Sequence, residues 1–410
     1  MAEMDTKAKR KIEVCYGETC AYWLAGRCTR SHCKFLHKIT PQASTTTPYR
    51  KYHSSASPQT SSLKSNSNRK DGTISTQKSS KSICKYWMNG NCLHAHQCWN
   101  LHSWFYGKGF SPLANLHQHK KTITGISLPN GTDKLFSCST DGTVRIWNCH
   151  TGKCADMTNA GGQVKSLISA GSWVFAALPN AIRAWNIQAL VDQTLDIPKG
   201  VLSMAAANNR LYAGAADGVI YVWNNTCDPK SPFQPFLALS GHTKSVVSLT
   251  LGVHNNLLFS ASMDHTIKVW DLETLQCITT LKAHNDAVTS LICWGNYLIS
   301  TSLDGTIKVW DATDGGKTFK VVYTHNEQHG IVALNGMVDL EGKPILFSSR
   351  KDNSVGIYEL PSFSERGRLF SKHEIHTIQV APGGLFFTGD NAGLLKVWNL
   401  AKPELKTTSS

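Results

Sequence analysis

The feature that most constrains this chain is an internal repeat of about 40 residues. The segment "LFSCSTDGTVRIWN" at 135–148 matches "LFSASMDHTIKVWD" at 258–271 and "LISTSLDGTIKVWD" at 298–311. Each copy joins β-branched and aromatic runs through Gly, Asn and Asp turns, a pattern typical of short strands. The copies end on aromatic residues that are 38, 38, 47, 40, 48 and 40 residues apart. These are Trp147, Trp185, Trp223, Trp270, Trp310, Tyr358 and Trp398.

This period, with a terminal Trp-Asp, resembles the WD repeat, whose units form the blades of β-propellers. Seven units predict a mainly β fold, with a seven-bladed WD-repeat β-propeller over residues 110–402 preceded by two small zinc fingers joined by a disordered linker. Residues 110–117 align with an outer strand, so we expect them to complete the seventh blade and remove a bare sheet edge.

The WD-repeat resemblance also implies a hydrogen-bonded tetrad of His, Ser/Thr, Asp and Trp inside a blade. Three blades have the matching residues: His119, Asp141 and Trp147; His242, Asp264 and Trp270; His284, Asp304 and Trp310. Pro179 and Ala392 replace the Asp in the second and seventh blades, and Tyr358 ends the sixth. We expect these three blades to be less regular.

Two Cys/His clusters precede the repeats, with the spacings C-x7-C-x4-C-x3-H and C-x7-C-x5-C-x3-H. Three thiolates and one imidazole suit tetrahedral Zn²⁺, and units this small need a metal in place of a core. The sequence therefore predicts two zinc ions, one per finger, at residues 14–40 and 81–105. The ligands are Cys20, Cys28, Cys33 and His37 in the first finger, and Cys84, Cys92, Cys98 and His102 in the second.

Positive charge is concentrated before the repeats. Residues 1–110 contain 17 Lys/Arg and 5 Asp/Glu, whereas the rest of the chain contains 25 and 23. Such an arm attracts polyanions, above all nucleic acid, although a solvated Lys-rich tail has the same composition. Residues 1–11 form a basic tail and 403–410 a second tail. The Ser/Thr/Lys-rich stretch 41–80 cannot bury enough apolar surface to fold, and we predict a disordered linker.

The cysteine spacing resembles the CCCH zinc-finger family, whose usual ligand is single-stranded RNA stacked on exposed aromatic rings. In this chain Trp23 and Trp87 could instead pack against the zinc site. The second finger departs from the family at Trp99, which lies one position early, and at Asn100, where Phe is expected. The contacts with RNA, or with DNA, that the resemblance implies are Tyr22, Trp23, Arg27, Arg30, Lys34, Phe35, Lys85, Tyr86, Trp87 and Trp99.

The finger, "LHSWF" (101–105) and a propeller containing "ALPNAI" (177–182) and "LPSFSERG" (360–367) together resemble the plant CCCH-finger/WD-repeat family. The resemblance implies a zinc-dependent nucleic-acid-binding adaptor whose propeller recruits a protein partner, and no enzyme reaction. The alternative is a pure protein-interaction scaffold, including a ubiquitin-ligase substrate receptor. The W-D-x-R motif of many such receptors is absent from "WDLE" (270–273) and "WDAT" (310–313).

The location of the protein follows from weaker signals. No apolar run of about 18 residues and no secretory leader are present, so we expect neither membrane association nor secretion. Thirteen cysteines in metal-like spacing indicate a reducing compartment. The basic run "KAKRK" (7–11) favours nuclear residence, with the cytoplasm as the alternative. Nothing indicates a small-molecule substrate.

Overall fold

The computed structural model describes residues 82–94, 97–107, 109–129, 131–226, 231–252, 256–282, 284–313 and 318–400. These residues belong to two compact units, of which one ends at His102 and the other resumes at Ser103. The ligands and contacts predicted for the first finger, and the predicted linker, lie outside the described residues. No helix in the described part has the length and apolarity that a bilayer span requires.

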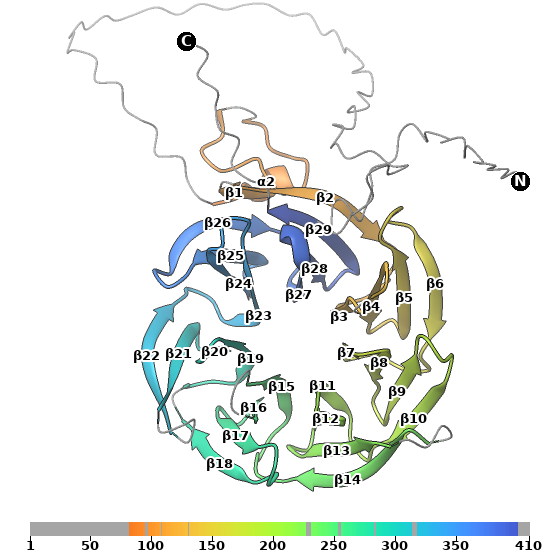
Figure 1. The fold of residues 1–410 in the computed structure, drawn as a ribbon. Coiled ribbons are helices and arrows are strands. Elements are labelled where there is room, and N and C mark those ends of the chain that lie inside the picture. Colours follow the sequence, from red (N-terminus) through yellow and green to blue (C-terminus); the bar gives the residue numbers. More distant parts are fainter. Residues whose placement is uncertain are drawn as a thin grey trace, which may run out of the picture. The chain divides into compact units, whose positions relative to one another are not determined.

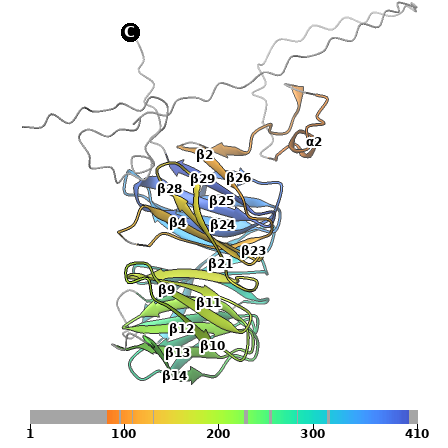
Figure 2. The ribbon, with the colours of Figure 1, turned by 90° about the vertical axis from the view of Figure 1, so that its right-hand side faces the viewer.

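The unit from Ser103 onward is a ring of seven antiparallel sheets, face-on in Figure 1 and from the side in Figure 2. The first three blades are β3 (Ile123–Ser127), β4 (Lys134–Ser139), β5 (Thr143–Asn148) and β6 (Cys154–Asn159); β7 (Ser166–Ala170), β8 (Trp173–Ala177), β9 (Ala181–Asn186) and β10 (Asp192–Asp196); and β11 (Val201–Ala207), β12 (Arg210–Ala215), β13 (Ile220–Asn225) and β14 (Phe233–Leu239). The fourth and fifth are β15 (Val246–Leu251), β16 (Leu257–Ser262), β17 (Ile267–Asp271) and β18 (Cys277–Leu281); and β19 (Val288–Trp294), β20 (Tyr297–Ser302), β21 (Thr306–Thr313) and β22 (Thr318–Asn326). The sixth contains β23 (Ile331–Val338), β24 (Pro344–Arg350), β25 (Ser354–Glu359) and β26 (Ser364–Phe370), and the seventh β27 (Ile375–Ala381), β28 (Leu385–Asp390) and β29 (Leu394–Leu400).

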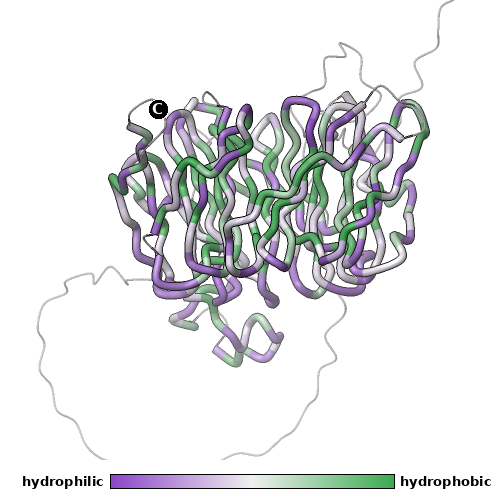
Figure 3. Tube along the Cα trace, turned by 90° about the horizontal axis from the view of Figure 1, so that it is seen from below, coloured by the Kyte–Doolittle hydropathy of each residue, from purple (hydrophilic) through white to green (hydrophobic). Residues whose placement is uncertain are grey.

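The hydrophobic core lies between neighbouring blades. Seven clusters of buried side chains each join two adjacent sheets, and one of them joins the seventh blade to the first through Ile123, Trp147, Phe387 and Leu395. In Figure 3 the hydrophobic colour accordingly follows the middle of the strands, while hydrophilic residues follow both rims. Burial of both sheet faces explains why these strands read as nearly continuous apolar runs.

The ring closes as the sequence predicted. Strand β2 (Phe110–His117) pairs antiparallel with β29, with Phe110 opposite Leu400 and His117 opposite Leu394. The register shifts between Pro112 and Ala114, where a bulge accommodates a residue without a backbone N–H. The N-terminal strand therefore supplies the outer strand of the last blade.

Strand β1 (Phe105–Gly107) extends the propeller beyond the expected start at residue 110. It adds a fifth strand to the sixth blade by pairing with β26. The Tyr106 hydroxyl donates to Glu365 at 2.5 Å, and the carbonyl of Trp104 accepts the Phe370 N–H at 2.8 Å. Gly107 has φ +118°, and a Cβ there would lie 2.6 Å from the carbonyl oxygen of Arg366, so the strand can approach only as glycine.

All three predicted tetrads are present. In the fourth blade, His242 Nδ1 lies 2.8 Å from Asp264, His242 Nε2 lies 2.8 Å from Ser260 Oγ, and the Trp270 indole N–H donates to the same hydroxyl at 2.8 Å. The equivalent bonds of the first and fifth blades measure 2.7–3.3 Å. The tetrad joins the connection before a blade to the turn between its second and third strands.

The blades without a tetrad still have all four strands, so our expectation of less regular sheets is wrong for strand pairing. The differences lie in the side-chain hydrogen bonds around the closing aromatic residue. In the sixth blade the Tyr358 hydroxyl donates to Glu327, which also accepts from Arg350 at 2.6 Å. In the seventh, Trp398 donates to Thr388 at 2.9 Å.

Two other blades lack the hydroxyl altogether. In the first blade the hydroxyl belongs to Ser137, two residues after Leu135, which is the cross-strand partner of the closing Trp147. The equivalent residues are Ala176 in the second blade and Ala213 in the third. The third blade was not among those expected to depart from the tetrad pattern.

Candidate zinc centre and propeller pocket

The second finger is built around the short helix α2 (Lys85–Met88). Cys84 is its N-cap, and the Sγ of Cys84 accepts the backbone N–H of Trp87 at 3.3 Å. The N–H of Cys84 in turn donates to the carbonyl of Leu101 at 2.9 Å, which brings the two ends of the finger together. Gly90 follows the helix with φ +76° and turns the chain back toward Cys92.

The four predicted ligands of this finger converge. One ligating atom from each of Cys84, Cys92, Cys98 and His102 lies within 4.8 Å of all the others. A tetrahedral zinc site with metal–sulfur distances of about 2.3 Å has ligand–ligand edges of roughly 4 Å. His102 Nε2 is buried and has no hydrogen-bond partner, as expected for a nitrogen that ligates a metal. Donor set and geometry therefore fit Zn²⁺.

The thiols influence one another's ionisation. Burial opposes ionisation of Cys84, but the Trp87 N–H and the side chains of His102, Cys92 and Cys98 lower its pKa from 9.0 to about 7. The pKa of Cys98 is raised: the Asn100 backbone N–H favours its thiolate, while burial and the neighbouring Cys84 and Cys92 outweigh it. A divalent cation removes this repulsion between thiolates, which is why such a set holds a metal. No disulfide forms among the eight cysteines that the structure describes.

The aromatic residues of the finger divide into two classes. The Trp87 ring is half-buried and stacks on His102, with ring centroids 5.6 Å apart and an interplanar angle of 12°. Tyr86 and Trp99 are 72% and 76% exposed, and Lys85 is also exposed. Of the two positions expected for Trp87, the structure has the one in which the ring packs against the zinc site. Tyr86 and Trp99 are the rings exposed to solvent in the described part of this finger.

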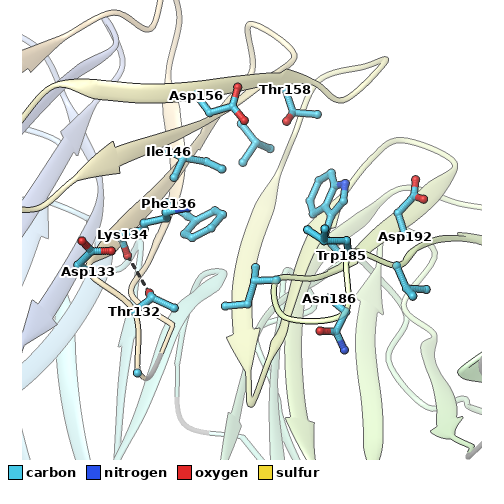
Figure 4. Close-up of a pocket in the computed structure, with 15 residues that line it drawn as sticks. Thr132, Asp133, Lys134, Phe136, Ile146, Asp156, Thr158, Trp185, Asn186 and Asp192 are labelled. Carbon is cyan, nitrogen blue, oxygen red and sulfur yellow. Dashed lines mark hydrogen bonds between the residues drawn. The ribbon is translucent and has the colours of Figure 1, made fainter.

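A pocket of about 630 Å³ lies between the first and second blades (Figure 4). Phe136 and Ile146 of the first blade face Trp185 of the second across it, and Asp156 and Asp192 lie on the adjoining outer strands. Asp133 and Lys134 also line it, so its lining contains three carboxylates and one amine. The volume is in the range of about 300–1,000 Å³ that ligand pockets have.

Trp185, which closes a blade without a tetrad, lines this pocket. It is the one repeat-closing tryptophan of the six that is not buried, and the structure gives its indole N–H no hydrogen-bond partner among the described residues. The Arg183 guanidinium lies 5.3 Å from the ring centroid and 3.5 Å from Asp192. Sequence reasoning missed this site, although Pro179 in place of the tetrad Asp was a signal for it.

Comparisons with known proteins agree with this architecture. The family described as "WD domain, G-beta repeat" matches residues 110–148, 233–271 and 275–311. The computationally designed Ika8 protein, a solved structure, is 22% identical with a TM-score of 0.54, over 70% of this chain and 99% of that one, and supports the fold alone.

Two curated relatives match nearly their whole length. Zinc finger CCCH domain-containing protein 17 of Oryza sativa subsp. japonica is 44% identical over 399 residues, covering 93% of this chain and 91% of that protein. Zinc finger CCCH domain-containing protein 63 of Arabidopsis thaliana is 41% identical over 420 residues, covering 97% and 92%. The chain therefore belongs to the plant family of CCCH zinc-finger proteins with a WD-repeat propeller.

Proposed function

We propose that this protein is a zinc-dependent RNA-binding adaptor, with single-stranded RNA preferred to DNA, whose propeller recruits a protein partner. The observation that supports RNA binding most directly is the exposure of Tyr86 and Trp99, whereas the neighbouring Trp87 packs on the zinc ligand His102. Tyr and Trp are enriched at binding interfaces, where an apolar ring with a polar group contacts a ligand. Base stacking on such rings beside lysines is the usual mode of single-strand binding.

The test is RNA binding by the full chain at low and high salt. Tyr86→Ala and Trp99→Ala should each weaken binding by about 1–3 kcal/mol per lost stacked base, at both salt concentrations. Leu93→Ala is the matched control, because Leu93 is 95% exposed in the same finger but has no ring. Zinc content must stay unchanged in all three. Wild-type RNA affinity in both ring variants would leave the scaffold alternative as the better proposal.

The partner site that we propose on the propeller is the pocket beside Trp185. Arg183 already lies over the indole ring and near Asp192, so the site tolerates a guanidinium. A peptide that places Lys or Arg next to an apolar side chain would pair with Asp133 or Asp156 and cover Phe136. Trp185→Ala should abolish binding of such a peptide while the propeller still folds, since that indole anchors no tetrad.

Two further proposals concern what the protein does not do and where it acts. Non-enzymatic action follows from the proposed roles of both modules, and a ubiquitin-ligase receptor role is disfavoured because Asp271 and Asp311 are not followed two residues later by Arg. Nuclear residence is proposed from the basic run 7–11, with the cytoplasm as the alternative. Unchanged nuclear signal after deletion of residues 1–11 would exclude that run as the import signal.

A further inference from the structure

Lysines gather at one end of the propeller. In an antiparallel four-stranded blade, the connection from the preceding blade and the turn between the second and third strands lie at the same end. The tetrads lie at this end of the ring, which we call the tetrad end. Six of the seven connections between blades contain a lysine there. They are Lys120, Lys165, Lys199, Lys244, Lys282 and Lys372.

The remaining connection, residues 327–330, has a substitute. Lys351 lies in the turn of the sixth blade, and its backbone N–H donates to the carbonyl of Gly330 at 3.0 Å. Lys121 follows Lys120 as an eighth lysine. Because the blades are arranged in a ring, as Figure 1 shows, the lysines surround the tetrad end on every side.

The side chains of these lysines are free, whereas their backbones are held. All are exposed except Lys165, which is half-buried, and none forms an ion pair with another described residue. The carbonyls of Lys121, Lys244 and Lys372 accept hydrogen bonds from Ser139, Ser262 and Asn353 at 2.9–3.1 Å. The ammonium groups thus project from fixed positions.

Acidic residues do not cancel this charge. Asp217, Asp286 and Asp352 are exposed at the tetrad end and Glu374 is half-buried. The tetrad carboxylates are only 7–9% exposed and accept several hydrogen bonds. In the described loops of the opposite end the balance is reversed, with Lys153 and Lys343 against Asp133, Glu273, Asp339 and Glu341. Charge is therefore sorted between the two ends of a propeller that is nearly neutral as a whole.

We infer that the tetrad end binds the phosphate backbone of RNA. Lysine is depleted in protein–protein interfaces and is a regular phosphate ligand. The tetrad end also has few apolar anchors, since Met263 is the one large hydrophobic residue exposed in its described loops and turns. An acidic protein partner would need such anchors, whereas a polyanionic backbone does not. The inference depends on the proposed function only for the choice of RNA as the polyanion.

The experiment uses the full chain and oligouridines of about 10 and about 40 nucleotides, with affinity measured against salt concentration. Lys120→Ala, Lys244→Ala and Lys372→Ala are combined in one variant. The control combines Lys153→Ala, Lys320→Ala and Lys343→Ala from the opposite end, so both variants lose three positive charges. On the longer RNA the first variant should flatten the slope of log K against log salt by about 2, at about 0.7 per lost contact, and the control should not. Equal effects of the two variants would overturn the inference.

Two further arms separate this inference from the proposed function. A Cys98→Ala variant disrupts the second finger alone. If it loses all RNA binding while the tetrad-end variant keeps the wild-type slope, the inference fails and the finger proposal stands. If it retains salt-dependent binding that the tetrad-end substitutions remove, the inference stands and the finger proposal fails. Loss of polyglutamate binding with unchanged RNA binding in the tetrad-end variant would assign these lysines to an acidic protein and overturn the inference.

Discussion

Replacing Ser260 by Ala tests how much a tetrad stabilises the propeller. The Ser260 side chain is fully buried, and its hydroxyl lies 2.8 Å from both His242 Nε2 and the Trp270 indole nitrogen. Since His242 Nδ1 faces the Asp264 carboxylate at 2.8 Å, Nδ1 carries the proton and Nε2 accepts from the serine. The substitution leaves one buried donor and one buried acceptor without partners.

The expected cost follows from those two groups. An unsatisfied buried polar group destabilises by about 1–3 kcal/mol, so two such groups should lower the free energy of unfolding by roughly 2–6 kcal/mol. For a domain of this size that lowers Tm by roughly 3–10 °C, measured by calorimetry or circular dichroism. Thr243→Ala removes an exposed hydroxyl from the next residue after His242 and should leave Tm nearly unchanged.

The result that would refute this reasoning is a Tm of Ser260→Ala equal to that of Thr243→Ala. It would mean that water enters the site or that packing alone holds the blade. The third blade makes that outcome conceivable, because Trp223 is 3% exposed there without any hydroxyl partner. Comparison of the Tm values of Trp223→Phe and Trp270→Phe would then show whether the third and fourth blades depend on their indole N–H groups to different degrees.

Three more predictions concern the metal, the ring closure and pH. Trp87→Ala should weaken zinc binding by the second finger because it removes the ring stacked on His102, whereas Trp99→Ala should not, and competition with a chelator measures both. A fragment of residues 103–402 should melt at a higher temperature than one of 118–402, which lacks β1 and β2; equal Tm values would show that these strands do not stabilise the ring. Burial lowers the pKa of His242 below its usual 6.5, as it does for the other two tetrad histidines. Below pH 6.5 the unfolded state therefore binds more protons than the folded state, and Tm should fall from pH 7 to pH 5. Although burial acts against ionisation of Asp264, hydrogen bonds from Thr266, His242 and Thr243 lower its pKa to about 2. The propeller should therefore lose further stability below about pH 4. A Tm that stays constant over both pH ranges would contradict these pKa shifts.

The repeat and the zinc ligands of the second finger could be predicted from the sequence because both depend on local spacing. The ring closure could be predicted because the last repeat lacks its outer strand. A His in the connection before a blade, a Ser ten residues before the closing Trp and a turn Asp six residues before it together specify a tetrad, as in 242–270. The third strand of the seventh blade, β29, needs an outer neighbour, and segment 110–117 aligns with an outer strand and pairs with it. Four ligands at finger spacing converge because a metal must take the place of a core in so small a unit. Among the residues of this unit that the structure describes, Cys84 is the one buried hydrophobic residue.

The remaining features depend on residues that meet only in the tertiary structure. Tyr106 finds Glu365 across 259 positions of sequence, so the fifth strand of the sixth blade has no local signature. Glu327 replaces a tetrad His by pairing with Arg350, a change that spacing does not reveal. Trp87 and Tyr86 are adjacent and equally aromatic, but helix α2 turns one onto His102 and the other into solvent. Likewise the lysines are about 40 residues apart in sequence, and only closure of the ring brings them to one end, since the fold converts a period along the chain into an arrangement in space.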